Sequence, residues 1–155
     1  TGFLSTALHT WDLIEVKLGT TQAALLHSLI VSQSDKLLSS DSKILQVESF
    51  IGSGYTAGSG GSTIANLFSQ QGAHGLATVL AANTTQAVVG GGSLTRLPSM
   101  CGAFQLLATE WHRTPIPEDR VLLLPSEALI VRPGNAATFG TPAIRVQAIL
   151  ELLRG

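Results

Sequence analysis

The sequence predicts an all-β fold, an antiparallel β-sandwich with a jelly-roll-like arrangement of about eight to ten short strands. Two observations carry this prediction. Short apolar segments recur along the chain, and several of them alternate apolar with polar residues. Clusters of glycine, serine, asparagine and proline separate these segments at short intervals, which is typical of turns between antiparallel strands rather than of βαβ units.

Three strands are expected in the first third of the chain, over residues 11–18, 24–33 and 44–51. The second is apolar on both faces in its middle. The first and third alternate, so that one face of each should contact the core. The residues expected on these core faces are Ile14, Val16, Leu18, Leu45, Val47 and Ile51.

The middle of the chain is broken by glycine. Half of residues 52–61 are glycine, which excludes a regular element and predicts a flexible surface loop. A short strand is expected over residues 63–68. For residues 76–82, alanine and leucine favour a helix, whereas the short length and the flanking breaks favour a strand, which we predict. A turn follows at residues 90–93.

Four more strands are expected toward the C-terminus, over residues 101–109, 121–125, 128–133 and 142–153, with a proline-containing loop over residues 112–120. The strands around Ser126 and Glu127 are close enough to need a tight turn. The last strand alternates strictly. Its predicted core face consists of Ile144, Val146, Ala148, Leu150 and Leu152, with Arg145, Gln147 and Glu151 opposite.

The length of 155 residues fits one domain, and we expect an N-terminal arm over residues 1–10 followed by a single β-sandwich domain over residues 11–155. Net charge is −1 with scattered basic residues, which argues against a nucleic-acid partner. No apolar run is long enough to span a membrane, and no secretory signal is expected. Charged residues make up only 12% of the chain, which favours subunit contacts, although a polar Ser/Thr/Gly surface is the alternative.

No catalytic, cofactor or metal site is predicted, so we expect no enzyme activity and no cofactor. The segment GSGYTA at residues 52–57 matches a loose dinucleotide-binding pattern, but no helix can begin there and no acidic residue follows at the required distance. From Ser49 to Thr109 the chain has no Asp or Glu, and Arg96 is its single Lys or Arg. Nucleophile-elbow and phosphate-loop motifs are absent from the sequence.

The individual reactive residues have structural interpretations. Cys101 is the single cysteine, so it forms no intrachain disulfide here and is expected to be a small buried apolar residue. The histidines lack partners at metal-ligand spacing, and Asn83-Thr84-Thr85, although a glycosylation sequence, is expected to be a turn. Most acids are expected to be solvated on strand faces or in loops. Trp11 and Trp111 are expected to lie in the core or in a subunit interface. The histidines are His9, His27, His74 and His112, and the acids are Asp12, Glu15, Asp35, Asp41, Glu48, Glu110, Glu118, Asp119, Glu127 and Glu151.

The order of motifs along residues 10–153 resembles a group of small tailed-bacteriophage virion structural proteins. The motifs are WDLIEV, LHSLIVSQSD, ILQVESFIGSG, ANTTQA, RTPIPEDR, LLPSEALIVRP and IRVQAILELL. The ending ELLRG is less acidic than is typical of that group. The resemblance implies a β-sandwich exposed on the particle as a homo-oligomer, a trimer.

The resemblance further implies a capsid decoration or minor capsid protein that binds the major capsid protein on the phage head surface, after synthesis in the host cytoplasm. The alternative is a receptor-binding or spike domain whose loops recognise the host surface. Copy number separates these hypotheses, because decoration requires as many copies as there are capsid sites.

Overall fold

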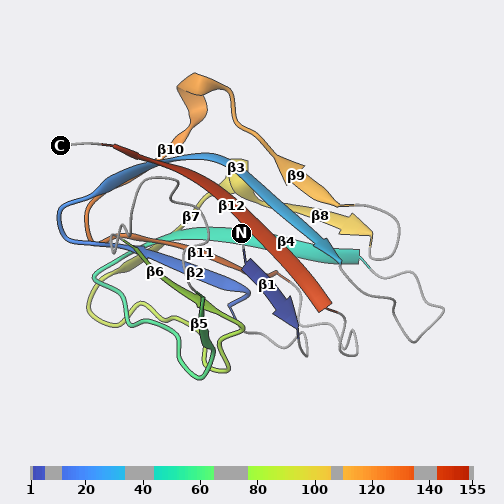
Figure 1. The fold of residues 1–155 in the computed structure, drawn as a ribbon, viewed down its shortest axis with the longest axis horizontal. Helices are drawn as coiled ribbons and strands as arrows, with labels where there is room; N and C mark the ends of the chain where they lie inside the picture. The colour runs from blue at the N-terminus through green and yellow to red at the C-terminus, as the bar shows by residue number, and fades with distance from the viewer. Residues whose placement is uncertain are drawn as a thin grey trace.

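The structure, a computed structural model, describes residues 2–5, 12–33, 44–64, 77–105, 110–134 and 143–153, which form two antiparallel β-sheets. The all-β prediction is confirmed: the described residues contain no α-helix and only two short 3-10 turns, η1 (Pro98–Met100) and η2 (Pro117–Asp119). In Figure 1 the strands β3 and β12 of one sheet cross over β4 of the other. The jelly-roll connectivity remains a prediction.

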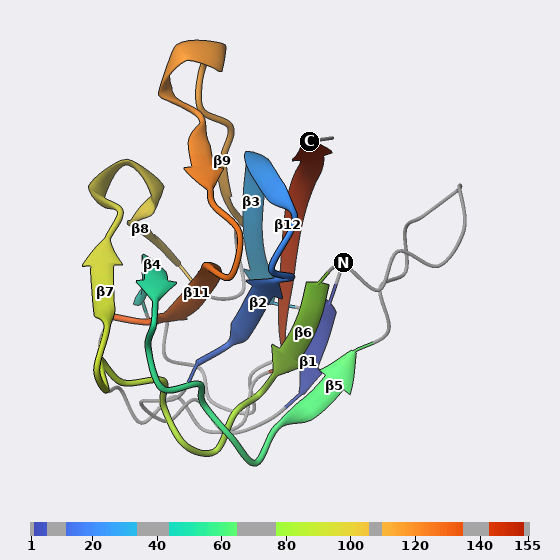
Figure 2. The same cartoon turned by 90° about the vertical axis from the view of Figure 1, so that its left-hand side faces the viewer.

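The first sheet, sheet A, has five strands in the order β1-β12-β3-β10, with β9 also paired to β3. The centre of this sheet is β3, because β12 runs along one of its edges while β10 and β9 pair in succession with the other. Its strands are β1 (Gly2–Ser5), β3 (Ala23–Gln33), β9 (Trp111–Arg113), β10 (Val121–Leu123) and β12 (Ala143–Leu153). The connection between β9 and β10 projects away from both sheets (Figure 2).

The second sheet, sheet B, has seven strands in the order β5-β6-β2-β11-β4-β7, with β8 also paired to β4. Its strands are β2 (Ile14–Leu18), β4 (Ile44–Ser53), β5 (Ser62–Ile64), β6 (Ala77–Ala81), β7 (Ser93–Arg96), β8 (Gly102–Gln105) and β11 (Ala128–Pro133). The central strand is β11, which pairs with β2 on one edge and β4 on the other. Residues 128–131 of β11 are buried on both faces of the sheet, so sheet B must be covered on its outer side as well.

The main core lies between the two sheets. Alternation on the strands predicted its members correctly in β2 and at the start of β4 and β12, since Ile14, Val16, Leu18, Leu45, Val47, Ile144 and Val146 are all at most 5% exposed. Ile51, Ala148 and Leu150 pack against this core while partly exposed. Face-to-face packing of two sheets around one apolar layer is the β-sandwich architecture that the sequence predicts.

The middle of β3 contains a β-bulge that explains its two-sided apolar pattern. The pairing with β12 steps from Ser28 to Leu26, so His27 has no partner in that register. One extra residue reverses which side chains face the core. As a result, Ala24 and Leu26 before the bulge and Leu29 and Val31 after it are all fully buried.

Twelve strands are described, two more than the upper limit predicted, because segments as short as three residues still pair. The segment at residues 76–82 is a strand, as predicted, since β6 pairs with both β2 and β5. The segment at residues 112–120 was predicted as a loop, but its first two residues belong to β9. The predicted arm, residues 1–10, contributes β1, which pairs with β12. Residues 65–68 and 106–109, which fall in predicted strands, lie outside the described residues.

Candidate functional site

The outer face of sheet B is covered by two segments, residues 53–61 and 82–92, which we call the cover. The segments pair with each other through backbone bridges between Thr56 and Val88 and between Ser59 and Thr85. A second, smaller apolar cluster lies beneath them. It contains Ala87, Ala128 and Ile130, with Phe50, Tyr55 and Leu94 packed against it.

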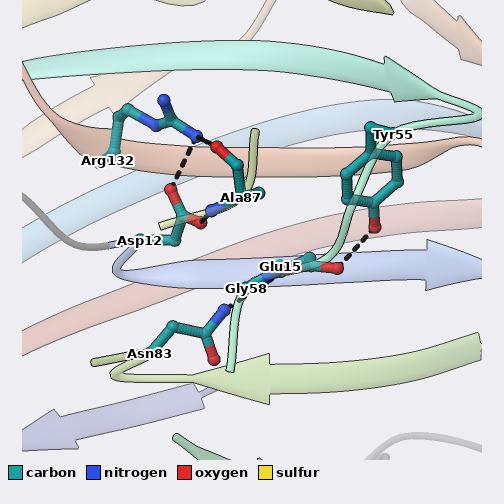
Figure 3. A network of polar contacts seen from close by, with 7 residues as sticks. All are labelled: Asp12, Glu15, Tyr55, Gly58, Asn83, Ala87 and Arg132. Carbon is teal, nitrogen blue, oxygen red and sulfur yellow. Dashed lines mark hydrogen bonds and ion pairs between the residues drawn. The ribbon is translucent and has the colours of Figure 1, made fainter. Parts of the chain in front are cut away.

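Glu15 holds the first cover segment. Its carboxylate accepts a hydrogen bond from the Tyr55 hydroxyl on one oxygen, and from the Gly58 N–H (3.1 Å) and the Asn83 side-chain amide (3.3 Å) on the other (Figure 3). Glu15 is only 1% exposed, and a buried carboxylate is costly unless such donors satisfy it. Glu15 therefore joins the middle of β2 to three points on the cover.

Asp12 and Arg132 hold the second cover segment. Asp12 accepts a hydrogen bond from the Ala87 N–H at 2.6 Å and forms an ion pair with Arg132 at 2.8 Å (Figure 3). The guanidinium also donates to the Ala87 carbonyl at 3.1 Å and lies 4.8 Å from the centre of the Phe50 ring. Arg132 thus binds both the Asp12 carboxylate and the Ala87 backbone that the same carboxylate holds.

Burial controls the protonation of this network. Desolvation raises the pKa of the Asp12 carboxyl, against the opposing effects of the Ala87 hydrogen bond and the Arg132 charge. Burial likewise raises the pKa of the Tyr55 phenol, and the hydrogen bond to Glu15 adds to that rise because it requires the phenol proton. Tyr55 therefore remains a neutral donor at neutral pH, as its bond to Glu15 requires.

Glycine allows the cover to approach the sheet this closely. A Cβ atom at Gly58 would lie 2.3 Å from the Asn83 amide nitrogen and 2.7 Å from the Thr85 carbonyl oxygen. The glycine-rich stretch lies at the surface, as predicted, but specific contacts hold it against β2 and the second cover segment. Its sequence is rich in glycine because the approach leaves no space for side chains.

Two acids are exceptions to the expectation that solvation explains most of the acids, since Asp12 and Glu15 are each 1% exposed. The sequence contains a clue to their burial, since a cover that lacks acids from residue 49 to residue 109 takes its anionic acceptors from the sheet beneath it. In this network every carboxylate contact is made by a donor from the protein, an arrangement suited to holding the cover in place.

The remaining candidate residues do not form one site. His27 pairs with Glu151 at 2.7 Å on sheet A, whereas His112 contacts Thr114 at 2.9 Å. Within the described part of the chain, no three His, Cys, Asp or Glu side chains are grouped as metal ligands would be. His9, Trp11, His74, Asp35 and Asp41 lie outside the described residues.

Three other predictions concern single residues. Cys101 is half-buried rather than fully buried, and its thiol donates to the Leu97 carbonyl at 3.1 Å. Trp111 packs against the main core while partly exposed. Asn83 is 1% exposed at a bend after β6, so its amide serves the internal network.

Leucine and isoleucine side chains are exposed on the outer face of sheet A, as Ile44 is at the start of β4 in sheet B. Leu122 in β10 and Leu124 just after it are 45% and 50% exposed, and Ile149 in β12 is 46% exposed. Leu122 lies opposite Leu25 in β3, which in turn lies opposite Glu151 in β12. Within the described residues this face therefore exposes apolar side chains among polar ones, which include Arg145, Gln147 and the His27–Glu151 pair.

Comparison with protein-family models, with curated proteins and with solved structures found no match to this chain. The described part of the chain contains no helix that is both long enough and apolar enough to span a membrane.

Proposed function

We propose that this chain is a virion structural protein, a capsid decoration or minor capsid protein that binds the major capsid protein on the head of a tailed bacteriophage. In this role it acts as a homo-oligomer, without cofactor or catalysis, and reaches the head surface after synthesis in the host cytoplasm. The apolar outer face of sheet A carries the proposal, and the resemblance noted above supplies the type of particle.

Exposed apolar side chains on this face support a contact role. Leu122, Leu124 and Ile149 are each about half exposed, although burying a leucine or isoleucine completely is worth about 1.5–3 kcal/mol. A charged fraction of 12% also fits the depletion of charge in interface cores.

The attachment of the cover to sheet B by buried hydrogen bonds and an ion pair supports the same role. A decoration protein transmits mechanical load between capsid subunits, so its outer layers must not detach from its core. The buried acids and their donors fix the cover at several separate points, namely Tyr55, Gly58, Asn83 and Ala87.

A receptor-binding or spike domain is the second candidate, favoured by one specific observation. The connection between β9 and β10 projects from the molecule, and Ile116 on it is 61% exposed (Figure 2). A protruding segment with an exposed apolar side chain is suited to contact with a host surface molecule.

The test is a reconstruction of particles assembled with the wild-type chain and with the double variant Leu122→Glu/Leu124→Glu. We expect the wild type at every equivalent head site and the variant at few or none of them. The matched control, Val88→Glu/Val89→Glu, alters two residues of similar exposure on the cover and should retain full occupancy. A few copies on a tail or spike, with binding of the purified chain to host cells, would instead establish the second candidate.

A further inference from the structure

The edge of sheet A beside β3 is interrupted by a segment that leaves the sheet. On this edge β9 ends at Arg113, opposite Leu29, and β10 begins at Val121, opposite Leu26. Residues 114–120, which we call the excursion, stand where an uninterrupted strand would need far fewer residues. Figure 2 shows this part of the chain, in orange, projecting from the sandwich. Compact surface segments whose two ends lie close together are frequently functional.

Prolines and a turn fix the backbone of the excursion. Proline locks its own φ angle and restricts the residue before it to an extended conformation. Ile116 lies between Pro115 and Pro117 and is extended, with φ −62° and ψ 156°. Its carbonyl accepts a hydrogen bond from the Asp119 N–H at 3.0 Å, which closes η2. The conformation that a partner would meet is therefore present before binding, which lowers the entropic cost of binding.

The base of the excursion is attached to both sheets. Arg113 belongs to sheet A, and its side chain donates through Nε to the Ser99 carbonyl of η1 at 2.8 Å. In turn, η1 connects β7 and β8 of sheet B. The Thr114 hydroxyl lies 2.9 Å from Nε2 of His112, and Pro115 is buried. The tip of the excursion therefore projects from a base that is held in place.

The tip of the excursion carries an exposed apolar side chain. Ile116 is 61% exposed, the highest value among the large apolar side chains that the structure describes. Burial within the fold therefore does not explain an apolar residue at this position. At protein interfaces a few side chains that enter pockets of the partner supply most of the affinity. A rigid segment with isoleucine at its tip is suited to act as such an anchor.

Two acids beside Ile116 give the tip a negative charge. Glu118 and Asp119 are both exposed, and neither forms an ion pair with another described residue. Arg120, which follows them, can offset only one of the two charges and is only partly exposed. Complementary charge across an interface sets specificity and the rate of association. A surface that fits this tip therefore has an apolar pocket with positive charge around it.

We propose that the excursion is a second anchor of the proposed capsid contact. Ile116 inserts into an apolar pocket of the major capsid protein, and lysine or arginine at the rim of that pocket faces Glu118 and Asp119. The inference rests on the proposed function, because the particle supplies the pocket.

Continuity with the exposed leucines of β10 favours the capsid protein over a host molecule as the occupant. Leu122 and Leu124 follow shortly after the excursion and are 45% and 50% exposed. The chain from Ile116 to Leu122 spans at most about 22 Å. One partner's share of a typical interface, about 800 Å², is a patch roughly 30 Å across. A single partner can therefore contact Ile116 and these leucines together.

The test measures binding of the purified chain to phage heads assembled without it, by counting bound copies over a range of chain concentrations. Ile116→Asp should raise the dissociation constant at least about tenfold, because burying an unpaired charge in an apolar pocket is costly. Ile116→Leu keeps an apolar side chain of the same volume and should bind nearly as the wild type does. The matched control is Val89→Asp, at a cover residue that is 50% exposed, and it should bind as the wild type does.

The positive rim is tested by the variant Glu118→Gln/Asp119→Asn. We expect it to bind more weakly than the wild type at low salt and to lose most of the salt dependence of binding. Circular dichroism and thermal unfolding establish that each variant is folded, as expected for changes that lie outside both sheets. Unchanged affinity and unchanged salt dependence would overturn the positive rim.

The outcomes separate this inference from the proposed function. If the wild type fills every equivalent head site and Ile116→Asp binds equally well, the inference alone is overturned. Equal weakening by Ile116→Asp and Val89→Asp overturns it as well. A wild type that does not bind heads overturns both the inference and the proposed function. If Ile116→Asp instead abolishes binding to host cells, the excursion belongs to the receptor-binding role and the inference is wrong.

Discussion

The outer faces of the two sheets differ in what covers them. On sheet B, the cover lies over a small apolar cluster and is held by two buried acids. On sheet A, the corresponding face exposes Leu122, Leu124 and Ile149. The chain therefore uses its buried polar interactions to close one side of the sandwich, whereas these three apolar side chains on the other side are exposed to solvent.

Breaking the buried ion pair between Asp12 and Arg132 should cause the largest loss of stability. Arg132→Met leaves Asp12, whose side chain is fully buried, without its counter-charge. Removing one partner of a buried pair costs about 3–5 kcal/mol. Urea unfolding should show a loss of this size, against less than about 1 kcal/mol for Arg96→Met, which removes the half-exposed pair with Glu48. Equal losses in the two variants would mean that the network does not hold the cover.

Crowding the cover should have the next largest effect. Gly58→Ala inserts a Cβ atom 2.3 Å from the Asn83 amide, and overpacking of this kind costs about 1–3 kcal/mol. Gly91→Ala is the control, since a Cβ atom there meets nothing within 4 Å. Hydrogen exchange of the cover amides should accelerate in Gly58→Ala but not in Gly91→Ala. Unchanged exchange in both would show that the cover does not approach β2 as described.

Removing the Tyr55 hydroxyl should have a smaller effect. The hydrogen bond to the Glu15 carboxylate is lost in Tyr55→Phe, and a bond to a charged group is worth about 1.5–3 kcal/mol, with the low end expected because Tyr55 is half-buried. Chemical denaturation at pH 7 measures the loss, with Tyr55→Leu as a comparison that also removes the ring.

The same variant tests a pH dependence. The pKa of Tyr55 is raised in the folded state, so above its usual value of 10.0 the unfolded chain has lost the phenol proton while the folded chain still holds it. Because the unfolded state then binds fewer protons, stability falls as the pH rises above 10. Stability of the wild type should therefore fall more steeply with pH than that of Tyr55→Phe. Tyr55 is the only tyrosine, so tyrosinate absorbance reports this group alone.

Substitutions on the outer face of sheet A should have the smallest effect on the stability of the fold. Leu122 is 45% exposed, and surface substitutions usually alter stability by no more than about 0.5 kcal/mol. Leu122→Ser should unfold at the same denaturant concentration as the wild type, while the proposed function predicts weaker binding to the major capsid protein. A loss above about 1 kcal/mol would contradict the difference between the two faces, because it would give Leu122 a role in the fold.

Alternation of apolar residues predicted the sandwich because one face of each strand meets the shared core. It predicted correctly that Ile14, Val16 and Leu18 of β2 face the core. It could not predict that Glu15, on the opposite face, is also buried, because alternation reports only that a face is polar. The burial of Glu15 depends on Tyr55, Gly58 and Asn83, which are 40 to 68 positions away in the sequence.

The bulge at His27 shows a second limit of sequence patterns. A single inserted residue changes which side chains face the core, so period-2 counting along β3 gives an apparent strand with two apolar faces.

The burial of Asn83 has a consequence for producing this protein. Asn83-Thr84-Thr85 is an acceptor sequence for glycosylation, yet the Asn83 side chain is 1% exposed and donates to Glu15. A glycan added to that amide during synthesis in a secretory pathway would have no room beneath the cover and would remove a donor from the buried carboxylate. The chain is therefore best produced in a compartment without oligosaccharyltransferase, or as the variant Thr85→Ala, which keeps the Asn83 amide and abolishes the acceptor sequence.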